Sequence, residues 1–159
     1  MQGEQTAVLL SDDDTRPVLS IVIAVLNEQD NLPQVCRELA EASVALPSVE
    51  IVFVDDGSTD STVVVLQRIR AEGILNLRVL QHDRRCGKSA ALRTGITAAQ
   101  GVWIATIDGD GQDDPRELPA LLTLARTATA APPLVGGVRT RRKGGWSRRR
   151  ATPCAPAVR

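Results

Sequence analysis

The sequence predicts an α/β domain built on a doubly wound, mainly parallel sheet with helices on both faces. Short aliphatic runs alternate four times with segments that have helical start and stop signals. Hydrophobic residues make up 43% of the chain, yet it holds one Phe, two Trp and no Tyr. The core must therefore be aliphatic, as in a parallel sheet covered by helices. Polar residues follow the predicted strands, where such sheets bind ligands.

Runs rich in β-branched residues predict the strands, and capping residues mark the helices. The expected strands span residues 19–26, 49–54, 77–80 and 102–107, with a fifth at 134–138. The expected helices span residues 31–45, 61–73 and 86–99, with a fourth that begins at Pro115 behind Asp114. We expect residues 1–17 to be a flexible leader, 18–138 to form the domain, and 139–159 to be a basic, poorly ordered tail.

Charge and cysteine placement narrow the class of protein. The chain has no net charge, but residues 139–159 hold seven Arg, one Lys and no acid, which leaves 11 basic and 19 acidic residues elsewhere. This division indicates a cation site in the body and an anionic partner for the tail. The three cysteines lack metal-binding spacing, so we expect free thiols in a reducing, cytoplasmic compartment. No apolar run approaches the roughly 20 residues that span a bilayer.

The segment IDGDGQDD, residues 107–114, follows a predicted strand and offers hard oxygen ligands. Asp108 and Asp110 stand two residues apart, and the amide of Gln112 adds a third oxygen. This donor set suits Mg²⁺ or Mn²⁺, either of which bridges to a diphosphate. An acidic surface turn is the alternative, and the segment alone does not decide between the two. An EF-hand loop is excluded because Asp113 stands where that loop needs Gly.

Two further segments lie between a predicted strand and a helix. In VDDGSTDST, residues 54–62, Asp56 can accept hydrogen bonds from a ribose or a base, although a turn with a helix cap explains most of the segment. In CGKSAALRTG, residues 86–95, Lys88 can contact a phosphate, with a solvated lysine as the alternative. A Walker A loop is excluded because His82 stands where its first Gly belongs. We expect a surface role for this histidine.

The basic segment GGVRTRRKGGWSRRR, residues 136–150, combines Arg side chains, which bind phosphates, with Trp146, which can rest at a membrane interface. A disordered basic tail is the alternative. Nucleic acid is not an expected partner, since one aromatic residue provides no stacking platform.

Together the segments SIVIAVLNE, VEIVFVDDGSTDST, GKSAALRTGI, IATIDGDGQDDPREL and VGGVRTRRKGGWSRRR resemble glycosyltransferase family two, in its dolichol- or polyprenyl-phosphate mannosyl- and hexosyltransferase branch. The resemblance implies a GT-A fold, Rossmann-like and here incomplete at the C-terminus. It implies an inverting, Mg²⁺- or Mn²⁺-dependent transfer of a hexose of the mannose or glucose type. The donor would be a GDP- or UDP-hexose. The acceptor would be a polyprenyl or dolichyl phosphate at the cytoplasmic face of an anionic membrane.

The resemblance also assigns roles to single positions. The nucleotide sugar would contact Ala24, Leu26, Glu28, Val54, Asp56, Lys88, Asp108, Gly109 and Asp110. Among these, Lys88 stands at the predicted start of a helix. Asp110 and Gln112 would bind the metal directly, with Asp108 in the ribose or metal shell. Arg139 would meet a donor or acceptor phosphate and join Asp108 and Asp110 in catalysis. Arg148 and Arg149 would hold the acceptor phosphate.

The chain departs from the family pattern in two ways. Leu26 stands where the family often has Tyr, which removes a stacking face for the base. The sequence also ends soon after the Arg cluster, where family members carry acceptor-side residues, so a truncated, non-catalytic fragment that binds nucleotide sugar is the first alternative. The second is a haloacid-dehalogenase-like phosphatase, whose DxDG loop matches Asp108–Gly111. That loop normally follows the first strand, whereas here it follows the fourth.

Overall fold

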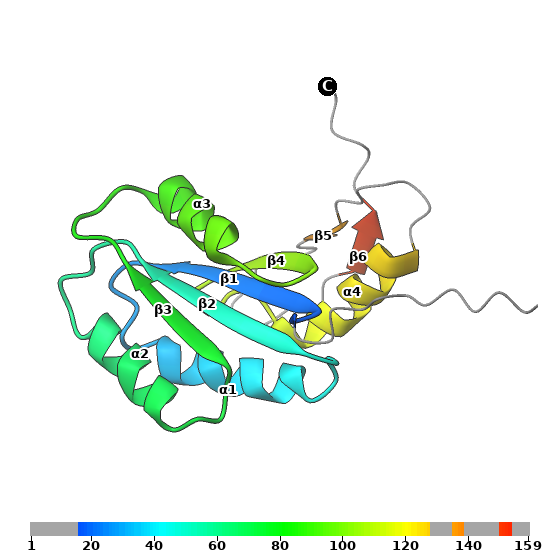
Figure 1. Ribbon diagram of the computed structural model, residues 1–159, viewed down its shortest axis with the longest axis horizontal. Coiled ribbons are helices and arrows are strands. Elements are labelled where there is room, and N and C mark those ends of the chain that lie inside the picture. Colours follow the sequence, from blue (N-terminus) through cyan, green and yellow to red (C-terminus); the bar gives the residue numbers. More distant parts are fainter. Residues whose placement is uncertain (1–15, 128–134, 139–149, 154–159) are drawn as a thin grey trace, which may run out of the picture.

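The computed structural model describes residues 16–127, 135–138 and 150–153. In this part of the chain, four parallel strands form a central sheet in the order β3-β2-β1-β4 (Figure 1). They are β1 (Leu19–Val25), β2 (Val49–Asp55), β3 (Leu77–Gln81) and β4 (Trp103–Asp108). The prediction of a mainly parallel sheet in an alternating α/β chain is confirmed.

Helices cover both faces of this sheet (Figure 1). One face carries α1 (Leu32–Ser43) and α2 (Thr62–Ala71), and the other carries α3 (Lys88–Ala98). A short 3-10 turn, η1 (Pro115–Glu117), follows β4, packs beside α1 and leads into α4 (Leu118–Thr127). The Asp114 side chain accepts a hydrogen bond from the backbone N–H of Arg116, which is the helix start that the sequence predicts.

The alternation of side chains along the strands divides the core into two clusters. Large aliphatic residues and Phe53 face α1, α2 and α4, where Leu32, Leu66 and Leu122 are buried. The opposite face carries smaller residues, and there α3 packs through Ala91 and Gly95. A side chain at Gly95 would collide with Val22 and Val54, so α3 lies close against β1 and β2.

Predicted and observed ends of the elements differ by up to two residues, and two elements differ in a way that the structure explains. Helix α3 begins at Lys88 and not at Cys86, because the Asp56 carboxylate accepts the backbone N–H groups of Cys86 and Gly87 and holds them in a loop. The expected fifth strand is β5 (Val135–Val138), which does not extend the main sheet. It pairs antiparallel with β6 (Arg150–Pro153), inside the range expected to be a tail, and both strands lie against α4. None of the helices in the described ranges is long and apolar enough to cross a bilayer.

Candidate functional site

A pocket lies at the carboxyl edge of the sheet, beyond the ends of β1, β2 and β4. Parallel pairing aligns these ends, since Ala24 is the register partner of both Val54 and Asp108. The pocket is lined by Ala24, Val25, Leu26, Glu28, Asp56, Arg85, Lys88, Asp108, Gly109 and Asp110. Every position predicted to contact the nucleotide sugar is therefore in its wall, except Val54. That side chain is buried beneath α3 with Val22 and Val52, because it points to the face of the sheet that α3 covers.

The loops after β1 and β2 are joined by backbone-to-side-chain hydrogen bonds. Asn27 adopts a left-handed conformation with φ 56°. Its N–H donates to Ser58 Oγ at 2.8 Å, and its Oδ1 accepts from the Thr59 N–H at 2.9 Å. The Glu28 N–H donates to Thr62 Oγ1 at 2.9 Å. The turn-and-cap residues of the DDGSTDST segment thus fix the loop that carries Glu28 into the pocket.

The neighbouring carboxylates Asp55 and Asp56 have separate partners. Asp55 is buried and accepts the N–H of Ser58 at 3.2 Å. Asp56 accepts the N–H of Cys86 at 2.8 Å on one oxygen and that of Gly87 at 2.7 Å on the other. Burial by itself raises the pKa of Asp56, but hydrogen bonds from Cys86, His82 and Gly87 outweigh it and lower that pKa below its ordinary value. Asp56 is therefore an ionised carboxylate at neutral pH.

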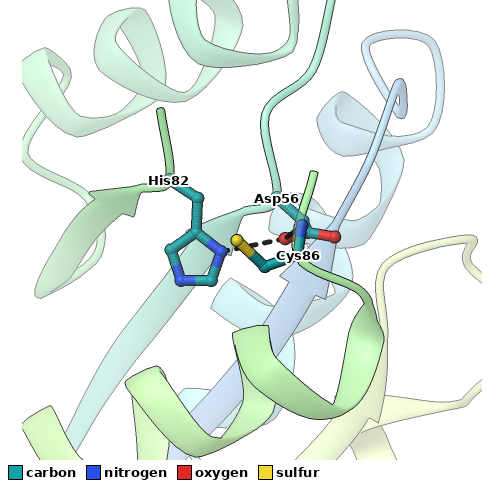
Figure 2. Close-up of side chains that lie close together, drawn as sticks. All are labelled: Asp56, His82 and Cys86. Carbon is teal, nitrogen blue, oxygen red and sulfur yellow. Dashed lines mark hydrogen bonds and ion pairs between the residues drawn. The ribbon is translucent and has the colours of Figure 1, made fainter. Parts of the chain in front are cut away.

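His82 lies beside Asp56, and the prediction of a surface role for it is wrong (Figure 2). Its Nδ1 lies 2.8 Å from Asp56 Oδ1 and its Nε2 lies 3.0 Å from Thr94 Oγ1, with 16% of the side chain exposed. The loop after β3 folds back over the end of β2 and carries the ring inward. Gly57 permits this path, since a Cβ there would lie 2.6 Å from the backbone carbon of Arg84.

The same loop brings two cations to the pocket. Arg85 lines its wall, although sequence reasoning gave it no role. Lys88, at the start of α3, places Nζ 2.6 Å from Asp108 Oδ1. Both side chains are substantially exposed, at 59% for Lys88 and 42% for Asp108, so this ion pair is in contact with solvent. The pair Arg84-Arg85, which stands just before the Cys86-Gly87-Lys88 helix start, was the sequence signal that could have indicated Arg85.

The loop after β4 presents the two carboxylates predicted to bind a metal. Gly109 is required there, because a Cβ would lie 2.5 Å from Val25 Cγ1. Asp113 accepts the N–H of Asp108 at 3.0 Å, and Asp110 accepts the N–H of Gln112 at 2.9 Å. Asp108 and Asp110 line the pocket, whereas Gln112 is exposed and is not among the lining residues. Their role as metal ligands remains a prediction.

The predicted phosphate-binding residues Arg139, Arg148 and Arg149 lie outside the described residues. The structure therefore does not test their assignment to an acceptor phosphate.

Comparison with known proteins shows which family the sequence is related to. The sequence model of Glycosyl transferase family 2 matches residues 20–154. A dodecaprenyl-phosphate galacturonate synthase from Rhizobium johnstonii is 36% identical over 139 residues, which cover 86% of this chain and 40% of that protein. An undecaprenyl-phosphate 4-deoxy-4-formamido-L-arabinose transferase from Sodalis glossinidius is 34% identical over 135 residues, 84% of this chain and 40% of that protein. This chain thus spans about 40% of the length of these relatives.

Solved structures share the fold. The mannosyltransferase PcManGT from Pyrobaculum calidifontis, in complex with GDP-Man and Mn²⁺, has a TM-score of 0.61 at 28% identity, covering 69% of this chain and 33% of that one. A glucosyl-3-phosphoglycerate synthase from Mycobacterium tuberculosis, in complex with Mn²⁺, UDP and phosphoglyceric acid, has a TM-score of 0.55 at 26% identity, covering 71% and 40%. The predicted GT-A fold is confirmed, and the DxDG sequence follows β4 of this fold, not the first strand of a phosphatase.

Proposed function

The chain belongs to glycosyl transferase family 2, and from this premise we propose that it forms the donor-binding part of a transferase that moves a sugar from a nucleotide diphosphate to a polyprenyl phosphate. The observation that carries the proposal is the composition of the pocket. The ends of three parallel strands and the start of α3 place acidic and basic side chains around one cavity. The names of the two bacterial relatives described above both refer to a polyprenyl phosphate.

The two kinds of charge in the pocket fit the two halves of a metal–diphosphate complex. Asp108 and Asp110 supply hard carboxylate oxygens, which suit Mg²⁺ or Mn²⁺. Such an ion, when bound, neutralises the charge that develops on a diphosphate leaving group. Arg85 and Lys88 face the same cavity and would bind phosphate oxygens directly. The ionised Asp56 would accept hydrogen bonds from the base or ribose.

The reaction needs little acid–base chemistry from the protein. An acceptor phosphate oxygen would attack the anomeric carbon while the bond from that carbon to the nucleoside diphosphate breaks. Single displacement through an oxocarbenium-like transition state inverts the anomeric configuration. The phosphate nucleophile is ionised at neutral pH and requires no strong base. The protein's part is to hold the two anionic partners in line, a task for Arg85, Lys88 and the predicted Arg139.

The pocket is large enough to hold only part of the nucleotide-sugar donor. Its volume is about 190 Å³, below the range of about 300–1,000 Å³ in which drug-sized ligands are usually enclosed. A bound nucleotide sugar would fill it and extend past it. We further propose a hexose of the mannose or glucose type on GDP or UDP, an acceptor phosphate held by Arg148 and Arg149, and action at the cytoplasmic face of an anionic membrane.

Isothermal titration calorimetry on the 159-residue chain tests donor binding. GDP, UDP and their hexose conjugates should bind in Mn²⁺ or Mg²⁺ and lose most of their affinity in EDTA. Asp110→Asn should weaken metal-dependent binding by up to about 2–5 kcal/mol, the usual loss from breaking a close charge contact. Glu72→Gln, which changes an exposed carboxylate at the end of α2, is the matched control and should bind as the parent does. Equal nucleotide binding in EDTA and in Mn²⁺ would contradict the proposal.

A further inference from the structure

A second group of metal-ligating side chains shares Asp56 with the pocket, whereas its other members, His82 and Cys86, are not among the lining residues. Ligand atoms of Asp56, His82 and Cys86 all lie within 4.8 Å of one another (Figure 2). We propose that this group, the Asp–His–Cys cluster, is a binding site for a thiophilic divalent cation, and that Zn²⁺ is the cation it binds.

The donor atoms of the cluster decide which cation it selects. A thiolate, an imidazole and a carboxylate form a ligand set typical of Zn²⁺, and three protein ligands leave a fourth position for water. Mg²⁺ and Mn²⁺ prefer oxygen ligands and gain little from sulfur. Arg84 and Arg85 directly precede Cys86 in the sequence and repel any incoming cation. The affinity must therefore come from the bonds to sulfur and nitrogen, which Mg²⁺ does not form well.

Two of the three ligands are already held in place. The Asp56 carboxylate is fixed by the N–H groups of Cys86 and Gly87 at 2.8 and 2.7 Å. The His82 ring is fixed between Asp56 and the Thr94 hydroxyl, at 2.8 and 3.0 Å. Tetrahedral bonds of about 2.0–2.3 Å place ligand atoms roughly 3–4 Å apart. The Asp56 and His82 ligand atoms, now 2.8 Å apart, must therefore separate slightly to admit a cation. The exposed Cys86 side chain can adjust to the third position.

The Thr94 hydroxyl allows the His82 imidazole to exchange its hydrogen bond with Asp56 for a bond to a cation. A hydroxyl both donates and accepts hydrogen bonds, so Thr94 can pair with His82 Nε2 whether or not that nitrogen carries the proton. When a cation takes Nδ1, the ring proton resides on Nε2 and is donated to Thr94, an arrangement common around metal-bound histidines. The Cys86 thiol gives up its hydrogen bond to the Arg84 carbonyl, 3.3 Å away, and releases its proton to solvent. Binding to the neutral imidazole thus liberates one proton per ion.

The cluster shares Asp56 with the pocket, and this has a consequence that rests on the proposed function. A cation at the cluster withdraws the Asp56 carboxylate from any ribose or base. It also draws in the loop that carries Arg85, another lining residue. Zn²⁺ should therefore weaken nucleotide binding, whereas Mn²⁺ at Asp108 and Asp110 should support it.

Cobalt spectroscopy tests the site without any nucleotide. The full chain carrying Cys154→Ala is titrated with Co²⁺, a coloured substitute for Zn²⁺. A thiolate-to-cobalt charge-transfer band and tetrahedral visible bands are expected, and excess Zn²⁺ should abolish both. Cys86→Ala should remove the charge-transfer band, and Cys36→Ala, which changes a buried thiol, should keep it. Thr94→Val should weaken Co²⁺ binding roughly 10–100-fold, as loss of a partner to a metal-bound histidine does. The same band in Cys86→Ala, or no band in the parent, would overturn the proposal.

A second titration separates the site from the proposed function. Zn²⁺ should weaken Mn²⁺-supported UDP or GDP binding in the parent chain and leave it unchanged in Cys86→Ala. A cobalt band in a chain that binds no nucleotide would leave the cation site standing and contradict the proposed function. Nucleotide affinity that is unchanged by Zn²⁺ in the parent would overturn the competition for Asp56.

Discussion

The ammonium group of Lys88 lies 2.6 Å from Oδ1 of Asp108, so a tethered cation already sits beside one of the carboxylates predicted to bind a metal. The pair joins the start of α3 to the end of β4, and both residues line the pocket. A metal ion and the lysine ammonium would therefore compete for Asp108 until a diphosphate arrives, after which both cations have an anionic partner.

This competition predicts opposite effects of one substitution. Lys88→Met should strengthen binding of Mn²⁺ alone by a few-fold, because the exposed ion pair that it removes is worth about 0.2–1 kcal/mol. The same variant should weaken binding of Mn²⁺ with UDP or GDP, since a phosphate ligand is lost. Electron paramagnetic resonance of free Mn²⁺ measures the first effect and calorimetry the second. Lys88→Arg is the charge-preserving control, and parallel changes of both affinities in Lys88→Met would contradict the competition.

Asp56→Asn should destabilise the fold by about 1.5–3 kcal/mol at pH 7, the cost of losing hydrogen bonds to a buried charge. Because the folded-state pKa of Asp56 is lowered, its stabilisation is present above the unfolded pKa and is lost as the pH falls through the folded value. The unfolded pKa is about 3.9. Urea melts at neutral pH and below about pH 4 should show that the difference between the parent and Asp56→Asn shrinks with acid. A difference that stays constant with pH would contradict this.

A buried polar cluster at the amino end of the sheet offers a substitution that should change the stability of the fold and leave nucleotide binding unchanged. Glu50 is 1% exposed and accepts hydrogen bonds from Ser20 Oγ, the Gln100 N–H and Arg78 Nη1, the last at 3.1 Å. Burial by itself raises the pKa of Glu50, but bonds from Ser20, Gln100 and Arg78 lower it. Glu50→Gln should lower the free energy of unfolding by about 1.5–3 kcal/mol. Nucleotide affinity measured well below the melting temperature should not change, and a matching loss of affinity would show coupling between the two ends of the sheet.

Gly109→Ala should displace the loop that presents Asp108 and Asp110. The added Cβ would lie 2.5 Å from Val25 Cγ1 and 3.2 Å from the Ala24 carbonyl oxygen, neither of which has room to move in a packed strand. We expect a stability loss of about 1–3 kcal/mol, as in other overpacked sites, together with loss of Mn²⁺-dependent nucleotide binding. Gly73→Ala is the control: no atom lies within 4 Å of the added Cβ, but φ is 68°, so this variant should lose stability through backbone strain and keep that binding. Retained binding in Gly109→Ala would show that the loop position is not critical.

The basic residues from Arg139 onward predict salt-sensitive binding to anionic vesicles. Each Lys or Arg near such a surface contributes about 1 kcal/mol of binding free energy. Co-sedimentation with phosphatidylglycerol vesicles should show binding by the full chain, and none after removal of residues 139–159. Neutral phosphatidylcholine vesicles are the control. Vesicle binding that survives the deletion would mean that these basic residues do not provide the attachment to the membrane.

The sequence by itself determined the four strands of the main sheet, the helices that cover it and the edge at which the ligand residues gather. Aliphatic runs and helix caps are local signals, and parallel strands necessarily end on the same side, so Glu28, Asp56 and Asp110 were placed correctly at one pocket. The resemblance to a family rested on the same local segments.

Only the tertiary structure decided which side chains meet. The path of the loop after β3 brings His82 to Asp56 and adds Arg85 to the pocket, and no periodicity in the sequence encodes that path. Helix α3 covers the face of the sheet to which Val54 points, so that side chain is buried with Val22 and Val52 and does not line the pocket. These contacts depend on how loops cross and how rotamers pack between segments that are distant in the chain. The alternation of strands and helices, by contrast, depends only on neighbouring residues.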